Sequence, residues 1–307
     1  MSTIEKLTVE HFESLGNGTP LLGLALMRSN EKAVQKDGRE YVKGVLATAT
    51  GTISYKIWPG ELADRLIGED WAGTVVAVKG KTNHYNGMKT MIIEDVSAVQ
   101  GDVSDFQEKK YDKDSMTAEF FGIYKDNLTP EGRAVFEALM TPIFARFQVE
   151  QGALAHHDAV LNGLLAHSLK CLRILDRTIE SYPAILERCD KDLLYIGVGC
   201  HDLGKVHEYN NGTISQMGKL ISHRTSAVIA LMNIGPLVIE KKGDDFLYRL
   251  AGIFEQHHGQ HEETPRTFEA MIVHSIDAME AAMTDLNEAA EKYKPYDQAY
   301  VGGFRLS

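Results

Sequence analysis

The spacing of apolar residues changes once along the chain. Between residues 20 and 100 they form short runs rich in β-branched side chains, which favour strands. From Thr129 onward they recur every three or four residues, as in amphipathic helices. Ser2–Leu15 also has an approximate helical face, with Ser2 and Glu5 at capping-box spacing. The pattern predicts an α+β chain of two domains, a small β unit followed by an all-α unit.

The β unit is expected to be a small barrel. Its strand-like runs are Leu21–Met27, Tyr41–Thr48, Gly51–Trp58, Thr74–Lys81 and Met88–Glu94. The Asn86-Gly87 pair between the last two runs is a strong hairpin signal, and a short helix is expected at Gly60–Ile67. Five strands with one short helix fit an OB-fold, although any small antiparallel sheet would give a similar pattern.

The all-α unit is expected to follow a polar connection. Residues 101–130 are charged and are interpreted as a linker with a bridging helix. The helices predicted after it are Thr129–Gln148, His157–Tyr182, Lys191–Cys200, Arg224–Asn233, Asp245–His258 and Thr267–Lys292. The predicted organisation is therefore an N-terminal helix at 1–17, a barrel at 18–100, the linker at 101–130 and a helical domain at 131–307.

Composition narrows the function classes. The net charge of the 307 residues is −11, and residues 101–307 hold 31 acidic against 21 basic side chains. Binding of nucleic acid through bulk positive charge is therefore excluded, which leaves local patches, bound cations and stacking. No apolar run approaches the ~20 residues of a membrane span. Three cysteines without Cys-x-x-Cys spacing are typical of reduced thiols in a cytoplasmic protein.

The segment His201-Asp202-Leu203-Gly204-Lys205 carries the clearest chemistry. A histidine beside an aspartate offers a divalent cation one neutral nitrogen and one anionic oxygen. Lys205 is predicted to be catalytic together with Asp202, by placing positive charge beside a phosphate bound to that cation. The alternative for Lys205 is a solvated lysine at the end of a helix.

Further possible metal ligands lie on other predicted helices. Asp277 falls on the inner face of an apolar helix, where a carboxylate is costly unless it is paired or coordinated. The predicted first site comprises His167, His201, Asp202 and Asp277. The predicted second site comprises His223, His257 and His258, with Asp202 as a bridge. For each histidine the alternative is a hydrogen-bonded core residue.

The ligand count predicts two cations. A pair about 3.5–4 Å apart can activate a water and neutralise charge that develops on a phosphodiester. Imidazole and carboxylate ligands together suit Mn, Fe, Co, Ni or Zn better than Mg or Ca. The residues thus point to metal-dependent hydrolysis of a phosphate ester.

The same residues resemble a known family. His167, His201-Asp202 and Asp277 are similar to the signature of HD-domain metal-dependent phosphohydrolases, and His223 and His257-His258 to its two-metal extension. The chain also resembles the YhaM-type 3′-to-5′ exoribonucleases over nearly its full length. In both, a barrel of the anticodon-binding OB type comes before the HD part. The segments that carry the resemblance are HHDAVLNGLLAHSLK, CHDLGK, ISH, EQHHG and VHSIDAMEAAM. The resemblance implies an HD domain, a cytoplasmic location, Mn or a similar cation, hydrolysis from a 3′ end, and a homo-oligomer.

Three functions remain open on the sequence. The first is a 3′-to-5′ exonuclease that acts on single-stranded RNA, or on DNA, and releases nucleoside 5′-monophosphates. The second is an HD phosphodiesterase for small or cyclic nucleotides, and the third a non-catalytic OB-fold binding protein. For the first, the residues expected to contact nucleic acid are Trp58, Tyr85, Lys56, Lys79, Lys81 and Lys89 in the barrel, with His156 and His157 near the metal ligands.

Overall fold

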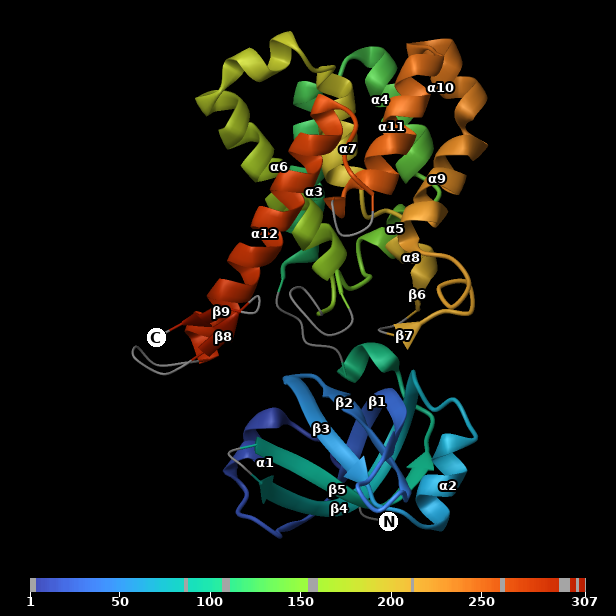
Figure 1. The fold of residues 1–307 in the computed structure, drawn as a ribbon, viewed down its shortest axis with the longest axis vertical. Coiled ribbons are helices and arrows are strands. Elements are labelled where there is room, and N and C mark those ends of the chain that lie inside the picture. Colours follow the sequence, from blue (N-terminus) through green and yellow to red (C-terminus); the bar gives the residue numbers. More distant parts are fainter. Residues whose placement is uncertain are drawn as a thin grey trace. The chain divides into compact units, whose positions relative to one another are not determined.

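The computed structural model divides the chain into two compact units, each described by itself (Figure 1). The barrel unit is Met1–Lys110 with Asn211–Thr213, and the helical unit is Tyr111–Asn210 with Ile214–Ser307. The residues that the structure describes are 4–85, 88–106, 111–153, 160–210, 213–259, 263–292, 299–301 and 304–306.

The barrel unit is a closed five-stranded barrel with the strand order β1-β2-β3-β5-β4. Neighbouring strands are antiparallel, except that β3 and β5 pair in parallel. The strands are β1 (Pro20–Val34), β2 (Glu40–Thr48), β3 (Gly51–Ile57), β4 (Thr74–Tyr85) and β5 (Met88–Ala98). The helix α2 (Glu61–Ile67) lies between β3 and β4 in the chain. This five-stranded arrangement is that of an OB-fold and confirms the predicted barrel.

The N-terminal helix is shorter than predicted. Among the described residues of this segment, only α1 (Val9–Ser14) is helical. Lys6 forms a parallel bridge to Leu24, and the amide of Leu7 donates to the Leu24 carbonyl at 2.8 Å. Leu7 is buried against the barrel, in the space that a Cβ at position 23 would fill. Gly23 therefore leaves room for this pairing, and the helix expected at Ser2–Leu15 is wrong over residues 4–8.

The helical unit consists of packed helices with short connections. These are α3 (Lys113–Asn127), α4 (Pro130–Met140), α5 (Phe144–Phe147), α6 (Gly163–Ser181), α7 (Lys191–Cys200), α8 (Lys205–Glu208), α9 (His223–Asn233), α10 (Gly235–Lys242), α11 (Asp244–Gln256) and α12 (Phe268–Lys292). The 3-10 helices are η1 (Val103–Phe106), in the barrel unit, and η2 (Pro183–Glu187). Two short sheets pair β6 (Tyr209–Asn210) with β7 (Thr213–Ile214) and β8 (Ala299–Val301) with β9 (Phe304–Leu306).

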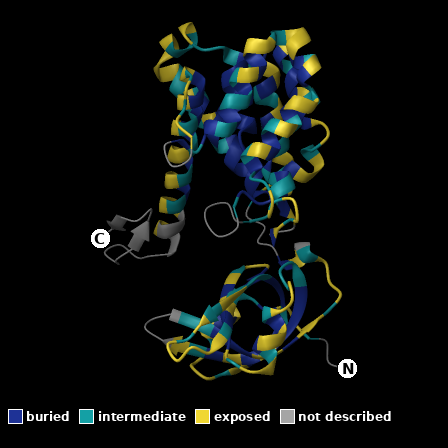
Figure 2. Ribbon diagram, turned by 45° about the vertical axis from the view of Figure 1, so that its right-hand side comes forward, coloured by how far each residue is buried: buried dark blue, intermediate teal, exposed yellow. Residues whose placement is uncertain are grey.

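Helix α7 is part of the core of the helical unit, where buried residues gather on the inner sides of the helices (Figure 2). Every residue from Asp192 to Cys200 is buried, and α7 packs against α3, α4, α6, α11 and α12. Phe120 and Tyr124 of α3 are part of the same core, so α3 packs within the helical unit. Because other helices surround α7, His201 and Asp202, which follow its last turn, are also buried. Among the described residues, no helix has both the length and the apolar character of a membrane span.

Candidate metal centre

The predicted ligands come from separate helices and meet in the core of the helical unit. His167 lies in the first turns of α6, His201 directly follows α7, and His257 directly follows α11. His223 opens α9, whose start is fixed by Ser222, because the Ser222 side chain caps the amide of Thr225. The ends of α7, α9 and α11 therefore set the positions of His201, His223 and His257.

Four side chains form the first group. The Nε2 atoms of His167 and His201 are 3.2 Å apart, and His167 Nε2 is 3.2 Å from Asp277 Oδ1. Oδ2 of Asp202 lies 3.6 Å from His167 Nε2 and 3.5 Å from His201 Nε2. His167, His201 and Asp202 are all buried, whereas the Asp277 side chain is 19% exposed. The first group therefore opens to solvent on the side of Asp277.

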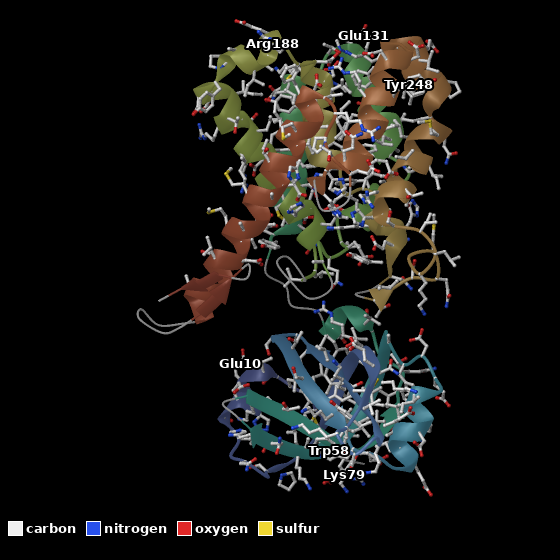
Figure 3. All side chains as sticks on the ribbon, viewed as in Figure 1. Glu10, Trp58, Lys79, Glu131, Arg188 and Tyr248 are labelled. Atoms are coloured by element: carbon white, nitrogen blue, oxygen red, sulfur yellow. The ribbon has the colours of Figure 1, made fainter. Side chains whose placement is uncertain are left out.

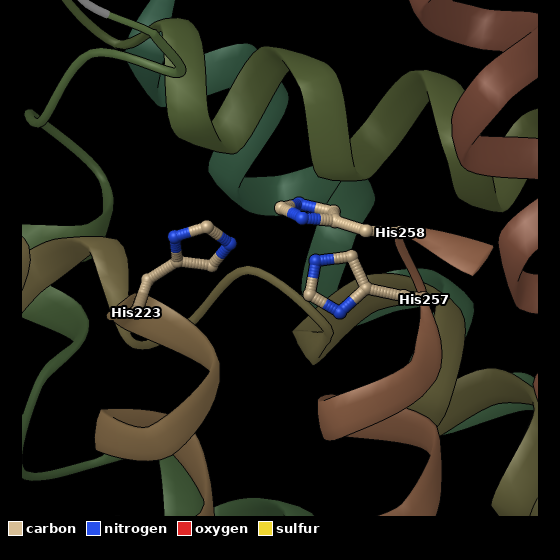
Figure 4. A group of neighbouring side chains, drawn as sticks. All are labelled: His223, His257 and His258. Atoms are coloured by element: carbon tan, nitrogen blue, oxygen red, sulfur yellow. The ribbon is translucent and has the colours of Figure 1, made fainter. Parts of the chain in front are cut away.

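The second group surrounds the other oxygen of Asp202. Oδ1 of Asp202 lies 3.5 Å from His223 Nε2 and 3.6 Å from His257 Nε2. The ring of His258 completes the group, with centroids 5.0 Å from His223 and 4.4 Å from His257 (Figure 4). Asp202 Oδ1, His223 Nε2 and His257 Nε2 are buried and have no hydrogen-bond partner among the described residues. Three buried polar atoms without partners, aimed at one another, are costly unless a cation joins them.

The imidazoles of His201 and His257 are each held by their other nitrogen. Nδ1 of His201 lies 2.8 Å from the Val198 carbonyl, and Nδ1 of His257 lies 2.9 Å from the Phe254 carbonyl. Because a carbonyl can only accept, Nδ1 carries the proton in both rings. In the neutral ring, Nε2 then presents its lone pair to the centre, as metal-binding histidines do.

The spacing of the ligand atoms fits a transition metal. The separations within the first group run from 3.2 to 3.6 Å. A tetrahedron with edges of about 3.4 Å has its centre about 2.1 Å from each corner, which is the usual length of a metal–imidazole bond. The first group therefore fits a divalent cation, and His223, His257 and His258 lie close enough to one another to hold a second, with Asp202 between the two groups. Ligation itself stays a prediction.

The charges of the centre favour a cation. Burial lowers the pKa of His201, but Asp202 and Asp277 outweigh burial and raise it to about 10. Burial raises the pKa of Asp202, but Lys205 and His201 hold it well below its usual value. Burial lowers the pKa of His257 to about 4. The carboxylates are thus ionised and His257 is neutral at neutral pH, as metal binding requires, whereas His201 carries a proton that a bound cation would displace.

Lys205 lies against the shared carboxylate. Its ammonium is 2.6 Å from Asp202 Oδ2 and donates to the Gly152 carbonyl at 2.7 Å, with the side chain 13% exposed. The alternative of a solvated lysine is therefore wrong. The Gly152 carbonyl holds the ammonium in place, and the ammonium in turn orients Asp202. A contact of the third N–H with substrate stays a prediction.

Sequence reasoning missed two carboxylates in this centre. Glu280 lies 2.6 Å from His167 Nδ1, and Glu208 lies 2.5 Å from His223 Nδ1. Glu280 follows Asp277 by three residues on α12, so the helical period could have placed the two on one face. Nothing in the sequence links Glu208 to a histidine fifteen residues later.

His274 supports the turn that carries His257 and His258. Its Nδ1 lies 2.7 Å from the His257 carbonyl, and its ring occupies the space that a Cβ at position 259 would fill. Gly259 has a φ of +68°. His274 and Gly259 therefore fix the turn that carries His257 and His258.

Trp58 is an exposed aromatic side chain of the barrel unit. Trp58 is 45% exposed, so it is not a core residue, and its ring centroid lies 5.6 Å from that of Tyr41 (Figure 3). Lys56 Nζ lies 5.6 Å from the Trp58 ring. Lys79 is exposed on β4, whereas Lys81 pairs with Glu94 at 2.9 Å. Trp58 and Lys56 thus form a small platform at the end of β3, with Trp58 directly after the strand.

Lys89 does not belong to this surface. Its ammonium donates to the carbonyls of Glu13 and Leu15 at 2.7 Å each, and only 8% of the side chain is exposed. It therefore anchors the end of α1, which corrects the expectation that it contacts nucleic acid. His156, His157 and the side chain of Tyr85 lie outside the described residues.

Comparison with known proteins agrees with this geometry. Residues 164–282 match the HD domain family model, a range that includes all seven predicted ligands. The 3'-5' exoribonuclease YhaM of Bacillus pumilus is 28% identical over 285 residues, covering 88% of this chain and 87% of the relative. The YhaM proteins of Bacillus subtilis and of Listeria monocytogenes are 26% and 27% identical, each over 88% of this chain.

Each of the following solved structures covers less than half of this chain. The mitochondrial single-stranded DNA binding protein Rim1 of S. cerevisiae covers 28% of this chain and 99% of its own, with 13% identity and a TM-score of 0.26. Asparaginyl-tRNA synthetase of Pyrococcus horikoshii covers 47% of this chain and 33% of its own, with 15% identity and a TM-score of 0.27.

Proposed function

Because this chain is an HD-domain hydrolase related to the YhaM 3′-5′ exoribonucleases, we propose that it shortens single-stranded nucleic acid from the 3′ end. RNA is the preferred substrate and DNA a further one. In each cycle water attacks the terminal phosphorus and the P–O3′ bond breaks. A nucleoside 5′-monophosphate leaves, and the shortened strand keeps a new 3′-hydroxyl.

One observation carries the proposal. Two groups of imidazoles share a single buried carboxylate, and three atoms of the second group have no partner among the described residues. When bound there, two divalent cations would polarise the phosphodiester and lower the pKa of the attacking water. Mn is the first candidate, followed by Fe, Ni, Co, Zn and Mg.

The protein's own residues prepare the centre. Asp202 offers one oxygen to each group, and Lys205 fixes the orientation of that carboxylate. The 19% exposure of Asp277 gives the terminal phosphodiester an approach from solvent. Trp58 and Lys56 support binding of the single strand by base stacking and by one cationic contact, with Lys79 and Lys81 as further contacts of the same proposal.

A substrate panel tests the proposal. The full chain is incubated with Mn and with single-stranded RNA, single-stranded DNA or cyclic dinucleotides, with the label at the 5′ end of each strand. Progressive shortening of labelled RNA with release of 5′-monophosphates supports it. Cleavage of cyclic dinucleotides alone would support a phosphodiesterase for small nucleotides, which the acidic charge of residues 101–307 favours. No turnover with Mn, Mg, Ni or Zn would support a binding protein.

Two further features belong to the same proposal. The three cysteines are free, which supports a reducing compartment and hence the cytoplasm. A homo-oligomer is expected from the resemblance to the family, and the mass of the full chain in solution, measured by light scattering, tests it.

A further inference from the structure

We infer that Glu280 and Glu208 are positioning residues, one for each of the two proposed cation sites. Glu280 holds His167 of the first group, and Glu208 holds His223 of the second. The inference rests on the proposed pair of cations and adds that the two sites have separate supports outside the ligands themselves.

Glu280 is built into the core around His167. Its side chain is 2% exposed, and Oε2 lies 2.6 Å from His167 Nδ1. The hydroxyl of Thr284 donates to Oε1 at 2.6 Å, and the Lys170 ammonium lies 3.0 Å from the same oxygen. Both oxygens are thus engaged, so Glu280 accepts the proton of Nδ1 and leaves His167 Nε2 for the first group.

Glu208 occupies the corresponding place beside His223. Its Oε2 accepts from the main-chain amide of His223 at 3.1 Å and lies 2.5 Å from Nδ1 of the same residue. The main chain at Glu208 is itself fixed, since its carbonyl accepts from the Ser215 amide at 2.8 Å. A single carboxylate therefore sets both the position and the ring orientation of His223.

The other two buried imidazoles have a different support. His201 and His257 donate to main-chain carbonyls three residues earlier, at Val198 and Phe254, which no side-chain substitution removes. Each group therefore has one imidazole held by a carboxylate and one held by the main chain. A carboxylate behind an imidazole fixes its tautomer and raises its basicity toward a metal.

A cation bound directly by Glu280 fits the contacts less well. His167, Cys171 and Glu280 do lie close enough to hold an ion. However, Cys171 Sγ is 3.8 Å from Nε2 of His167, the nitrogen that also faces the first group, and both Glu280 oxygens have partners. Glu280 is therefore assigned to orient His167 and not to bind metal.

Metal binding without substrate tests the inference. Mn is titrated calorimetrically into the full-length Glu280→Gln and Glu208→Gln variants, and bound Mn is counted by elemental analysis. Glutamine keeps the size and an acceptor oxygen but removes the charge. Each variant is expected to bind one of two equivalents about 10–100-fold more weakly, as for other supports of metal-binding histidines. Glu119→Gln is the matched control, because Glu119 pairs at the surface with Arg173 of α6 and is expected to leave both equivalents unchanged.

Combined variants assign each support to its site. Glu280→Gln should add little to the loss caused by Asp277→Ala, but its effect should add fully to that of His258→Ala. Glu208→Gln should show the opposite pattern. Restoring the charge with Glu280→Asp should recover part of the affinity, which a purely structural role would not predict.

The outcomes separate this inference from the proposed function. Two unchanged equivalents in both glutamine variants, or equal weakening of both equivalents by each, would overturn the assignment. If Glu280→Gln does not fold, the partly exposed Glu208→Gln still decides the second site. Wild-type protein that binds two equivalents but leaves RNA intact would refute the exonuclease proposal while leaving the positioning roles standing.

Discussion

Replacing Gly259 by alanine tests how tightly the turn that carries His257 and His258 is defined. Gly259 has a φ of +68°, and a Cβ there would lie closer to the ring of His274 than van der Waals contact allows. The same ring holds the His257 carbonyl at 2.7 Å. The substitution therefore strains the backbone and also displaces the side chain that fixes the turn.

The expected cost follows from these two effects. A left-handed backbone at a residue with a Cβ costs about 1–2 kcal/mol. Loss of the hydrogen bond between His274 and His257 costs about 1 kcal/mol more. We expect Gly259→Ala to lower the free energy of unfolding by about 2–3 kcal/mol and to weaken the second cation site.

Urea denaturation of the metal-free variants measures this cost, and Mn titration measures the effect on the site. His274→Ala alone should cost about 1 kcal/mol, because it loses only the hydrogen bond. The double variant should cost less than the two single costs added together, because the overlap disappears once the ring is absent. Additive costs, or a Gly259→Ala protein as stable as the wild type, would refute this explanation of the turn.

Other predictions concern pH, packing and the barrel surface. Burial lowers the pKa of His201, but Asp202 and Asp277 raise it to about 10, above its unfolded value of 6.5. The bound proton therefore stabilises the metal-free fold, and this stabilisation is complete below pH 6.5. That stability should be lost as the pH rises through about 10, while Mn affinity rises over the same range, as melting and titration at each pH would record. Gly132→Ala should lower the melting temperature through a loss of about 1–3 kcal/mol, because its Cβ would overlap the buried Asp192. Trp58→Ala should weaken binding of single-stranded RNA by about 1–3 kcal/mol in fluorescence anisotropy without changing the melting temperature.

The gathering of these side chains in one place could be predicted, because their residue types are costly elsewhere in a core. An aspartate on an apolar helix face, such as Asp277, needs a partner, and the His201-Asp202 pair supplies one at a fixed spacing. The barrel could also be predicted, because the alternation of apolar and polar residues and the Asn86-Gly87 turn signal are local features of the sequence. Those strands pair with Tyr85 opposite Met88, as a two-residue connection requires.

The supports of the site could not be predicted, because they depend on tertiary contacts. The roles of Glu208 and Lys89 follow from partners 15 and 74–76 residues away, which no local period encodes. The helix predicted for the N-terminal segment was wrong for a similar reason. Leu7 pairs with β1 only because Gly23 leaves room for its side chain. Local propensity predicted a helix there, and the tertiary pairing prevailed.

The most direct test of the central claim counts bound metal and follows RNA in the same preparation. Full-length protein and an Asp202→Ala variant are loaded with Mn, analysed for metal content, and incubated with 5′-labelled single-stranded RNA. We predict two Mn per wild-type chain and a ladder that shortens from the 3′ end, with loss of turnover and a lower metal content in the variant. Wild-type protein that shortens RNA without bound metal, or an Asp202→Ala variant with full activity, would contradict the account.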